Sequence, residues 1–321
     1  METAQRLKIL QTWLAHQGYP DVALQPVSGD ASARQYYRIQ VGDQSRLVMD
    51  APAQVDECHA YLEVQKLMAQ AGLHVPRIDA ADPNAGFMLI EDLGARDYLA
   101  AVRESPDEQW WNDAISALVR WQAATRKPML PHYGADRLSA ELELFPTWYV
   151  SQHLGVEPSA KWQQRWAAGS EQLITAAINQ PQVWVHRDFM LRNLLVSSPN
   201  PGVIDFQDAL TGPVTYDLVS LLRDAFFSLT PAAEAHWIDV YANQAKHAGI
   251  ALPEDLLKHI DLMGAQRHLK VLGIFARLRY RDGKPHYLDD APRFLQYLAA
   301  ELAPYPAFAD FADLIADLPE Q

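Results

Sequence analysis

The chain has 321 residues, 49% of them apolar, and carries a formal net charge of −13 at pH 7. This length allows one large domain or two lobes, and the apolar fraction can form a substantial core. The acidic balance argues against a nucleic-acid-binding surface, because such surfaces need clustered basic side chains. It could attract a cationic substrate, although an acidic balance more often simply keeps a protein soluble.

Cys58 is the only cysteine, which excludes an intramolecular disulfide and is typical of a reducing compartment. Its place in a helical pattern favours a packed structural thiol over a nucleophile. The first residues lead into an amphipathic pattern, and neither a signal peptide nor a membrane-spanning run is visible. These features predict a cytoplasmic protein that binds neither membranes nor nucleic acids.

The N-terminal part of the chain predicts a small, mostly antiparallel sheet with one inserted helix. Apolar residues at helical spacing predict helices over residues 4–17 and 55–71. β-Prone segments, two of them joined by a turn at Gly42, predict strands over residues 36–41, 46–49, 75–78 and 86–94. Gly94 is the predicted hinge at the end of this lobe.

From about residue 106 the pattern becomes strongly helical. The predicted helices cover residues 110–121, 142–149, 162–178, 214–229, 231–248, 254–282 and 289–302. Short β-prone runs lie between residues 183 and 206. The sequence therefore predicts an α+β fold of two lobes, a small β-rich lobe over residues 1–93 and a larger helical lobe over 94–321.

Two polar motifs follow these short β-prone runs. Residues 186–193 read His-Arg-Asp-Phe-Met-Leu-Arg-Asn, and Asp205 lies between the apolar residues Ile204 and Phe206. Phosphoryl transfer from a nucleotide needs clamped phosphates, neutralised charge and an acceptor hydroxyl held in line. Asp188 is the predicted base, because a carboxylate can take the hydroxyl proton without leaving a cation beside the acceptor.

The same motifs supply candidate metal ligands. Asn193 and Asp205 offer the hard oxygens that Mg²⁺ prefers, and this ion usually takes only one or two protein ligands beside substrate phosphates. Acids that merely end strands and cap turns are the alternative. Arg192 is predicted to reach the transferring phosphate, with a solvated arginine equally open, and His186 is predicted to pack beneath the loop and hydrogen-bond to its backbone.

These motifs resemble the catalytic and metal-binding loops of the protein-kinase-like superfamily. No Ala-Pro-Glu motif follows Asp205, and residues 212–218, Gly-Pro-Val-Thr-Tyr-Asp-Leu, resemble the branch of aminoglycoside phosphotransferases and choline kinases. In that branch an aspartate matching Asp217 supports the catalytic loop by hydrogen bonding, with helix capping as the alternative. Four blocks are similar to the anomeric N-acetylmuramate/N-acetylglucosamine kinases of bacterial cell-wall recycling: residues 29–38, 49–52, 264–275 and 281–284.

The resemblance implies an ATP-dependent kinase that uses Mg²⁺ and phosphorylates the anomeric hydroxyl of N-acetylmuramate, N-acetylglucosamine or both. It also implies an adenine pocket at the hinge, lined by Ile90, with contacts from the C=O of Glu91 and the N–H of Leu93. Two alternatives stay open: an aminoglycoside, choline or other small alcohol as acceptor, and a non-catalytic nucleotide-binding homologue.

The chain departs from the general kinase pattern at the phosphate clamp. The strand that carries a phosphate-binding lysine in kinases reads Leu-Val-Met-Asp here, over residues 47–50. Small residues around Ser32 could let backbone N–H groups approach the phosphates. Arg34, Arg38 and Arg46 are candidates for the missing charge, and alternation along a strand sends such residues to different faces.

A second basic feature concerns the acceptor. Four basic residues recur near one face of the predicted helix 254–282: Arg267, Lys270, Arg277 and Arg281. We hypothesise that Arg267 meets the lactyl carboxylate of N-acetylmuramate, since a bidentate arginine suits such a group. Arg223 and Asp224 are similar candidates for acceptor contacts. An ordinary solvated face is the alternative.

Overall fold

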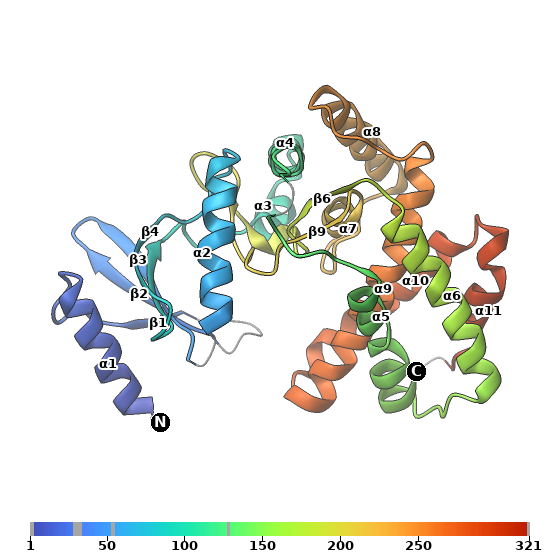
Figure 1. Cartoon of the computed structure of the whole chain (residues 1–321), viewed down its shortest axis with the longest axis horizontal. Coiled ribbons are helices and arrows are strands. Elements are labelled where there is room, and N and C mark those ends of the chain that lie inside the picture. Colours follow the sequence, from blue (N-terminus) through green and yellow to red (C-terminus); the bar gives the residue numbers. More distant parts are fainter. Residues whose placement is uncertain (1–2, 28–33, 53–54, 127–128, 320–321) are drawn as a thin grey trace. The chain divides into compact units, whose positions relative to one another are not determined.

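The computed structural model describes residues 3–27, 34–52, 55–126 and 129–319. The chain divides into two compact units, and Figure 1 labels most of their helices and strands. Unit 1 contains Met1–Pro106 and Arg192–Asp208, and unit 2 contains Asp107–Leu191 and Ala209–Gln321. Within the described ranges, no helix combines the length and apolar character needed to cross a membrane.

Unit 1 is built around an antiparallel sheet of five strands in the order β1-β2-β3-β5-β4. Its strands are β1 (Gln25–Val27), β2 (Gln35–Val41), β3 (Gln44–Asp50), β4 (Ile78–Asp82) and β5 (Phe87–Glu91). Its helices are α1 (Thr3–His16), α2 (Val55–Gln70) and α3 (Tyr98–Glu104). The second segment of the unit forms the short pair β7 (Leu194–Leu195) and β8 (Gly202–Val203).

The two faces of the sheet are covered by different helices. Leu10 and Leu14 of α1 are buried against alternate residues of three strands, among them Ile39, Val48 and Leu89. This is the period-2 pattern expected where one sheet face is packed. Figure 1 shows α1 and α2 on opposite sides of the sheet.

The predicted helices 4–17 and 55–71 and the strands 36–41 and 46–49 are confirmed within one or two residues. The strand predicted at 75–78 is wrong, because β4 runs over Ile78–Asp82. Pro76 lacks the N–H that a strand interior needs. The C=O of Arg77 accepts a 2.8 Å hydrogen bond from the N–H of Glu91, but the N–H of Arg77 donates to the Glu91 side chain and not to a strand backbone.

The units depart from the predicted division at residues 93 and 94, since residues 94–106 and 192–208 pack with unit 1. Backbone hydrogen bonds explain the difference. The N–H of Val203 donates to the C=O of His74 at 2.8 Å, and the N–H of Val196 donates to the C=O of Arg96 at 2.8 Å. The division of the chain into functional lobes at the hinge remains a prediction.

Unit 2 is mostly helical, so the predicted α+β class is confirmed. Its helices are α4 (Glu108–Ala123), α5 (Ala135–Leu142), α6 (Ala160–Ile178), α7 (Tyr216–Leu222), α8 (Pro231–His247), α9 (Leu256–Asp282), α10 (Ala291–Leu302) and α11 (Ala309–Ala316). The π-helix η1 (Phe145–His153) and the 3-10 helices η3 (Pro285–Asp290) and η4 (Pro306–Phe308) lie between them. The strands β6 (Gln182–Val185) and β9 (Leu210–Pro213) form an antiparallel pair.

Two predicted helices of this unit are wrong in extent. The pattern over 142–149 spans the end of α5 and the start of η1, where Pro146 lies within the first turn. The helix predicted over 214–229 stops at Leu222, and the carboxylate of Asp224 then accepts the N–H of Phe226 at 2.7 Å. This local side-chain hydrogen bond competes with continuation of the helix.

Helix α9 forms the centre of unit 2 and is buried on nearly all sides from Ile260 to Ala276. Leu269, Leu272 and Phe275 belong to the main apolar cluster, which also contains residues of α5, α6, α10, α11 and η1. The predicted basic face therefore divides along the helix. Arg267 and Lys270 are buried, whereas Arg281 is exposed.

The buried guanidinium of Arg223, directly after α7, holds several helices of unit 2 together. It donates to Glu301 of α10 at 2.7 Å, to Asp261 of α9 at 2.7 Å and to Glu234 of α8 at 2.9 Å. His268 Nδ1 lies 3.0 Å from the same Glu301 carboxylate. These contacts compensate several charges in a dry interior, where an unpaired carboxylate is costly.

Arg223→Met is expected to lower the free energy of unfolding by about 3–5 kcal/mol at pH 7, because it leaves buried carboxylates without their cation. The loss should shrink at acidic pH, since burial raises the pKa of Asp261 and protonation then removes the uncompensated charge. Denaturant unfolding at both pH values measures the effect.

Arg165→Met is the matched control for this measurement. Arg165 pairs with Asp310 at 3.0 Å, but that carboxylate is 74% exposed. An exposed pair of this kind contributes only about 0–1 kcal/mol. Equal losses in the two variants would contradict the structural role assigned to Arg223.

Candidate active site

The loop that carries Asp188 begins at the end of β6 and is held by a buried carboxylate of α7. Asp217 accepts the N–H of His186 at 2.6 Å and the N–H of Arg187 at 2.9 Å, and its side chain is fully buried. Burial raises the pKa of Asp217, against the influence of His186 and of these N–H donors. The loop-supporting hydrogen bonds implied by the resemblance are therefore present.

His186 packs beneath the loop as predicted. It is fully buried, and the N–H of Asp188 donates to its Nδ1 at 3.3 Å. Its ring makes an edge contact with Phe189 at 5.7 Å between centroids. Asp224 fixes the far end of the loop by accepting the N–H of Leu191 at 3.0 Å, and burial raises the pKa of Asp224 to about 6.

Both motifs contain a residue in a backbone conformation that L-amino acids rarely adopt. The φ angle is +79° at Arg187, next to Asp188, and +62° at Asp205. Such residues cost free energy and persist only where the surrounding structure enforces them, which often marks a functional site. At Arg187 the enforcing contacts include an ion pair with Glu141.

The carboxylate of Asp188 is open to solvent, with 41% of its side chain exposed. Arg267 supports it from α9: Nη1 donates to the C=O of Arg187 at 3.1 Å, and Nη2 lies 3.8 Å from Asp188 Oδ1. The same Nη1 lies 3.2 Å from the hydroxyl of Tyr216. Arg267 thus contacts the backbone of the loop and faces its acid.

Further charges balance this cluster. Lys270, one turn along α9, donates to the hydroxyl of Tyr216 at 3.0 Å and lies 3.3 Å from Glu141. Desolvation opposes ionisation of Asp188, but the cations of Arg267, Lys270 and Arg187 hold its pKa below the usual range. Asp188 is therefore an ionised carboxylate at neutral pH, as a base must be.

Unit 1 contains the predicted metal ligands. Asn193 ends the 3-10 helix η2 (Leu191–Asn193), and its C=O accepts the N–H of Ile204 at 3.1 Å, which brings the adjacent Asp205 near it. The side chain of Asp205 is 49% exposed, and Gln207 Nε2 donates to its Oδ1 at 3.1 Å. Phe206 is fully buried and packs on Tyr61 of α2, with ring centroids 4.7 Å apart.

This donor set fits Mg²⁺ better than a metal that needs a closed protein site. Among the described residues, no group of three or more His, Cys, Asp or Glu side chains is placed to hold an ion. A solvent-open carboxylate beside an amide suits Mg²⁺, which keeps several waters and binds through one or two protein ligands plus phosphates.

The predicted hinge follows β5. Ile90 is buried opposite Leu47 of β3, whereas Glu91 and Leu93 are half-buried. Asp92 fixes the segment, because its carboxylate accepts the N–H of Gly94 at 3.0 Å and pairs with Arg38 at 2.5 Å. The predicted adenine contacts of Glu91 and Leu93 stay predictions.

The structure treats the remaining candidates differently. Arg192 is half-buried in η2, and Arg34 is placed directly before β2. The predicted phosphate-loop residue Ser32 lies outside the described residues. Arg223 and Asp224 are engaged in the packing contacts given above, which favours structural roles over acceptor contacts.

Sequence reasoning missed Glu141 of α5, which pairs with both Arg187 and Lys270. It also gave no role to Tyr216, whose hydroxyl meets Arg267 and Lys270. Tyr216 lies in the recognisable block 212–218, which was a usable signal. Glu141 lies 46 positions before Arg187, and nothing in its local pattern separates it from a surface acid.

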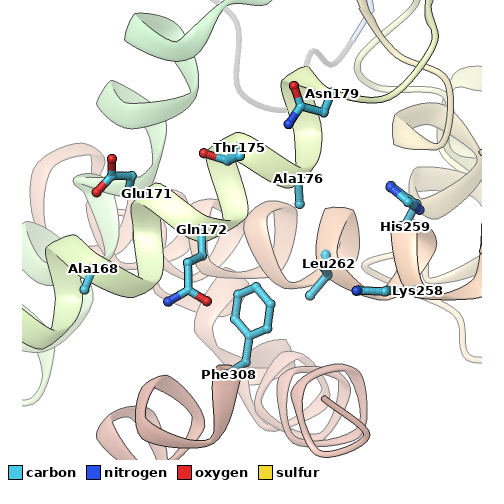
Figure 2. Close-up of a pocket in the computed structure, with 10 residues that line it drawn as sticks. All are labelled: Ala168, Glu171, Gln172, Thr175, Ala176, Asn179, Lys258, His259, Leu262 and Phe308. Atoms are coloured by element: carbon cyan, nitrogen blue, oxygen red, sulfur yellow. The ribbon is translucent and has the colours of Figure 1, made fainter. Parts of the chain in front are cut away.

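A groove elsewhere on unit 2 has a volume of about 590 Å³. Figure 2 shows its lining, in which Leu262 and Lys258 from α9 and Phe308 from η4 lie along α6. None of the residues predicted for catalysis, nucleotide binding, metal binding or acceptor binding lines this groove.

Residues 23–256 match the family described as the phosphotransferase enzyme family. The N-acetylmuramate/N-acetylglucosamine kinase of Pseudomonas aeruginosa is 47% identical over 304 residues, covering 94% of this chain and 90% of that protein. The kinase of the same name from Neisseria meningitidis is 41% identical over 329 residues, covering 98% of this chain and 97% of that protein.

Solved structures share the fold at low sequence identity. The ADP-bound aminoglycoside phosphotransferase APH(2'')-Ib gives a TM-score of 0.64 at 13% identity and covers 94% of this chain and 99% of its own. Choline kinase LicA of Streptococcus pneumoniae gives a TM-score of 0.66 at 13% identity, with 92% and 99% covered. The chain belongs to the phosphotransferase enzyme family and is a small-molecule kinase, as its motifs predicted.

Proposed function

We propose that this kinase transfers the γ-phosphoryl group of ATP to the anomeric hydroxyl of N-acetylmuramate, N-acetylglucosamine or both, in cell-wall recycling. The observation that carries the proposal is the similarity, over nearly the whole chain, to relatives named for kinase activity on these two sugars. The ionised, solvent-open Asp188 supports the same chemistry, because it can serve as the base for a hydroxyl acceptor.

In this proposal Asp188 accepts the hydroxyl proton as the bond between the acceptor oxygen and the γ-phosphorus forms. The bond between that phosphorus and the β,γ-bridging oxygen breaks, and ADP leaves. Arg192, four positions after Asp188 in the chain, steadies the γ-phosphate during transfer. Asp217 accepts hydrogen bonds from the loop backbone and Arg267 donates one to it, so the base is fixed before the acceptor arrives, which lowers the cost of orientation.

The nucleotide side of the reaction is assigned to unit 1. Glu91 and Leu93 contact the adenine through backbone groups beside Ile90. When bound by Asn193 and Asp205, Mg²⁺ would neutralise charge on the phosphates. The φ of Asp205 and its contact with Gln207 support a fixed carboxylate for that purpose.

On the acceptor side, Arg267 is the strongest of the three predicted residues, since it faces Asp188. Its guanidinium is nearly buried, so its main proposed role is to orient the base and keep it ionised. Contact with the lactyl carboxylate of N-acetylmuramate remains a second role to be tested.

Acceptor identity is tested with a panel of N-acetylmuramate, N-acetylglucosamine, an aminoglycoside and choline, each with ATP and Mg²⁺. Phosphorus NMR should show a new sugar 1-phosphate with the two amino sugars only. The methyl glycoside of N-acetylglucosamine is the matched control, because its anomeric oxygen is blocked, and it should stay unphosphorylated. Phosphate on another hydroxyl, or turnover of the methyl glycoside, would reject the anomeric assignment.

Asp188→Asn is expected to lower kcat by about 10²- to 10⁴-fold, because the amide keeps the shape but cannot accept the proton. ATP affinity, measured by calorimetric titration, should stay at the wild-type value. Asp239→Asn, on the exposed surface of α8, is the control and should turn over normally. A variant at Asp188 with wild-type kcat would remove this residue from the chemistry.

Arg267→Gln is expected to shift the acidic limb of the kcat/KM profile to higher pH. Loss of the cation raises the pKa of Asp188, so the base becomes protonated, and inactive, at a pH where the wild type still works. Arg267→Lys keeps the charge and should shift the limb less. An unmoved limb in the Gln variant would contradict the electrostatic role.

The same two variants test sugar contact. If Arg267 binds the lactyl carboxylate, the ratio of kcat/KM for N-acetylmuramate over N-acetylglucosamine should fall, because only the first sugar carries that group. An unchanged ratio would leave Arg267 solely with its role at the base.

A further inference from the structure

The phosphate clamp of this kinase lacks the strand lysine, since β3 carries no lysine between Gln44 and Asp50. A cation beside the phosphates is a recurring part of phosphoryl-transfer sites, because it offsets the charge of the transferring group. The sequence offers three candidate arginines on or next to the first strands of unit 1, at positions 34, 38 and 46, without a basis for choosing among them. The side-chain contacts of unit 1 separate the three.

Arg46 lies on the sheet face that α1 covers. It is directly opposite Ile39 in the β2–β3 register, and opposite residues of an antiparallel pair share a face. Ile39 belongs to the apolar cluster that α1 packs against. The guanidinium of Arg46 is paired with Asp79 of β4 at 2.6 Å, so Arg46 belongs to the face away from α2.

Arg38 is engaged at the hinge. Its Nε and Nη2 lie 2.5 Å and 3.3 Å from the two carboxylate oxygens of Asp92. That carboxylate is nearly buried and also accepts hydrogen bonds from Ser45 and from the N–H of Gly94. Arg38 therefore stabilises the segment after β5. Because its guanidinium pairs with both oxygens of Asp92, we assign it a structural role.

Arg34 has different surroundings. Its Nη2 donates to Glu57 in the first turn of α2 at 3.1 Å, and its Nη1 lies 3.8 Å from Asp205 Oδ1. The arginine side chain is only 9% exposed, whereas the two carboxylates are 46% and 49% exposed. One buried cation thus faces two acids that both open to solvent, and one of them is the proposed metal ligand.

The two acids that Arg34 faces belong to segments that pack on each other. Phe206, next to Asp205, packs on Tyr61 of α2, the helix that carries Glu57. Burial opposes the charge of Arg34, but Tyr36, Glu57 and Asp205 outweigh it and raise its pKa.

We infer that Arg34 is the phosphate-binding cation of this kinase and that Glu57 anchors it. The inference rests on the proposed use of ATP and adds the residue that replaces the strand lysine. A cation next to Asp205 can bind the same phosphates that the Asp205 carboxylate serves through its ion. The pair of Arg34 and Glu57 then performs the task of the lysine–glutamate pair of protein kinases from a different strand position.

The test is calorimetric titration of the full-length protein with ATP and with adenosine, with Mg²⁺ and in EDTA. Arg34→Met is expected to weaken ATP binding by about tenfold or more, since charge-assisted hydrogen bonds to phosphate are lost. Adenosine affinity should stay unchanged, because adenosine has no phosphates. The loss should persist in EDTA, where Asp205→Asn should no longer weaken ATP binding.

Three variants control the measurement. Arg46→Met removes an arginine from the opposite sheet face and should bind ATP as the wild type does. Arg34→Lys keeps the charge without the planar fork and should restore part of the affinity. Glu57→Gln should weaken ATP binding modestly and add nothing in the Arg34→Met background, since it acts through that residue.

The outcomes distinguish this inference from the function on which it rests. Absence of ATP binding by the wild type would overturn the proposed function and the inference together. ATP binding by the wild type, with equal losses for ATP and adenosine in Arg34→Met, would overturn the inference alone. If Arg34→Met unfolds, as circular dichroism would show, Arg34→Lys and Glu57→Gln decide: unchanged ATP affinity in both would overturn it.

Discussion

The hydrogen bonds from the N–H groups of His186 and Arg187 to the buried carboxylate of Asp217 are the constraint on which the rest of the active-site loop depends. A fully buried acid is tolerated only when it is hydrogen-bonded, so α7 and the loop stabilise each other. With the backbone held there, Arg187 is kept at its unusual φ and Asp188 is directed toward solvent. The buried carboxylate of Asp224 accepts the N–H of Leu191 in the same way, so the loop is fixed at both ends.

The charges around this loop leave the Asp188 carboxylate open to solvent, whereas Glu141 is paired with buried cations. Glu141 and Asp188 face three cations, Arg187, Arg267 and Lys270, of which the last two come from successive turns of the buried helix α9. Burial would normally penalise so many charges, but each has a partner of opposite sign or a hydroxyl within reach. The result is an ionised carboxylate at Asp188 whose partners cannot rearrange easily, because they are packed in the core of unit 2.

In unit 1, one buried arginine, Arg34, faces two solvent-open acids. The sheet of this unit is covered on one face by α1, and Arg34 lies beside Glu57 of α2 and beside Asp205. We infer that Arg34, directly before β2, replaces the missing strand lysine and that the acidic Glu57 of α2 anchors it.

The sequence by itself determined the fold class and the family, because these depend on periodicity and on global similarity. It also predicted that His186 would pack beneath the loop, since a histidine two positions before the acid can reach its backbone. The sequence-based prediction was wrong for the strand at Pro76, which lacks a backbone N–H donor. It was also wrong for the helix after Leu222, where the side chain of Asp224 takes a backbone N–H instead.

Only the tertiary structure decided which of the charged residues meet. Arg223 looked like an acceptor ligand and proved to bind Glu234, Asp261 and Glu301, and Glu141 carried no local signal for its pairing with Arg187. The inference that selects Arg34 among the three candidate arginines likewise depends on strand register and on the contact with α2. Long side chains from distant segments find their partners through the packing of whole helices and sheets, and neither spacing nor composition encodes that arrangement.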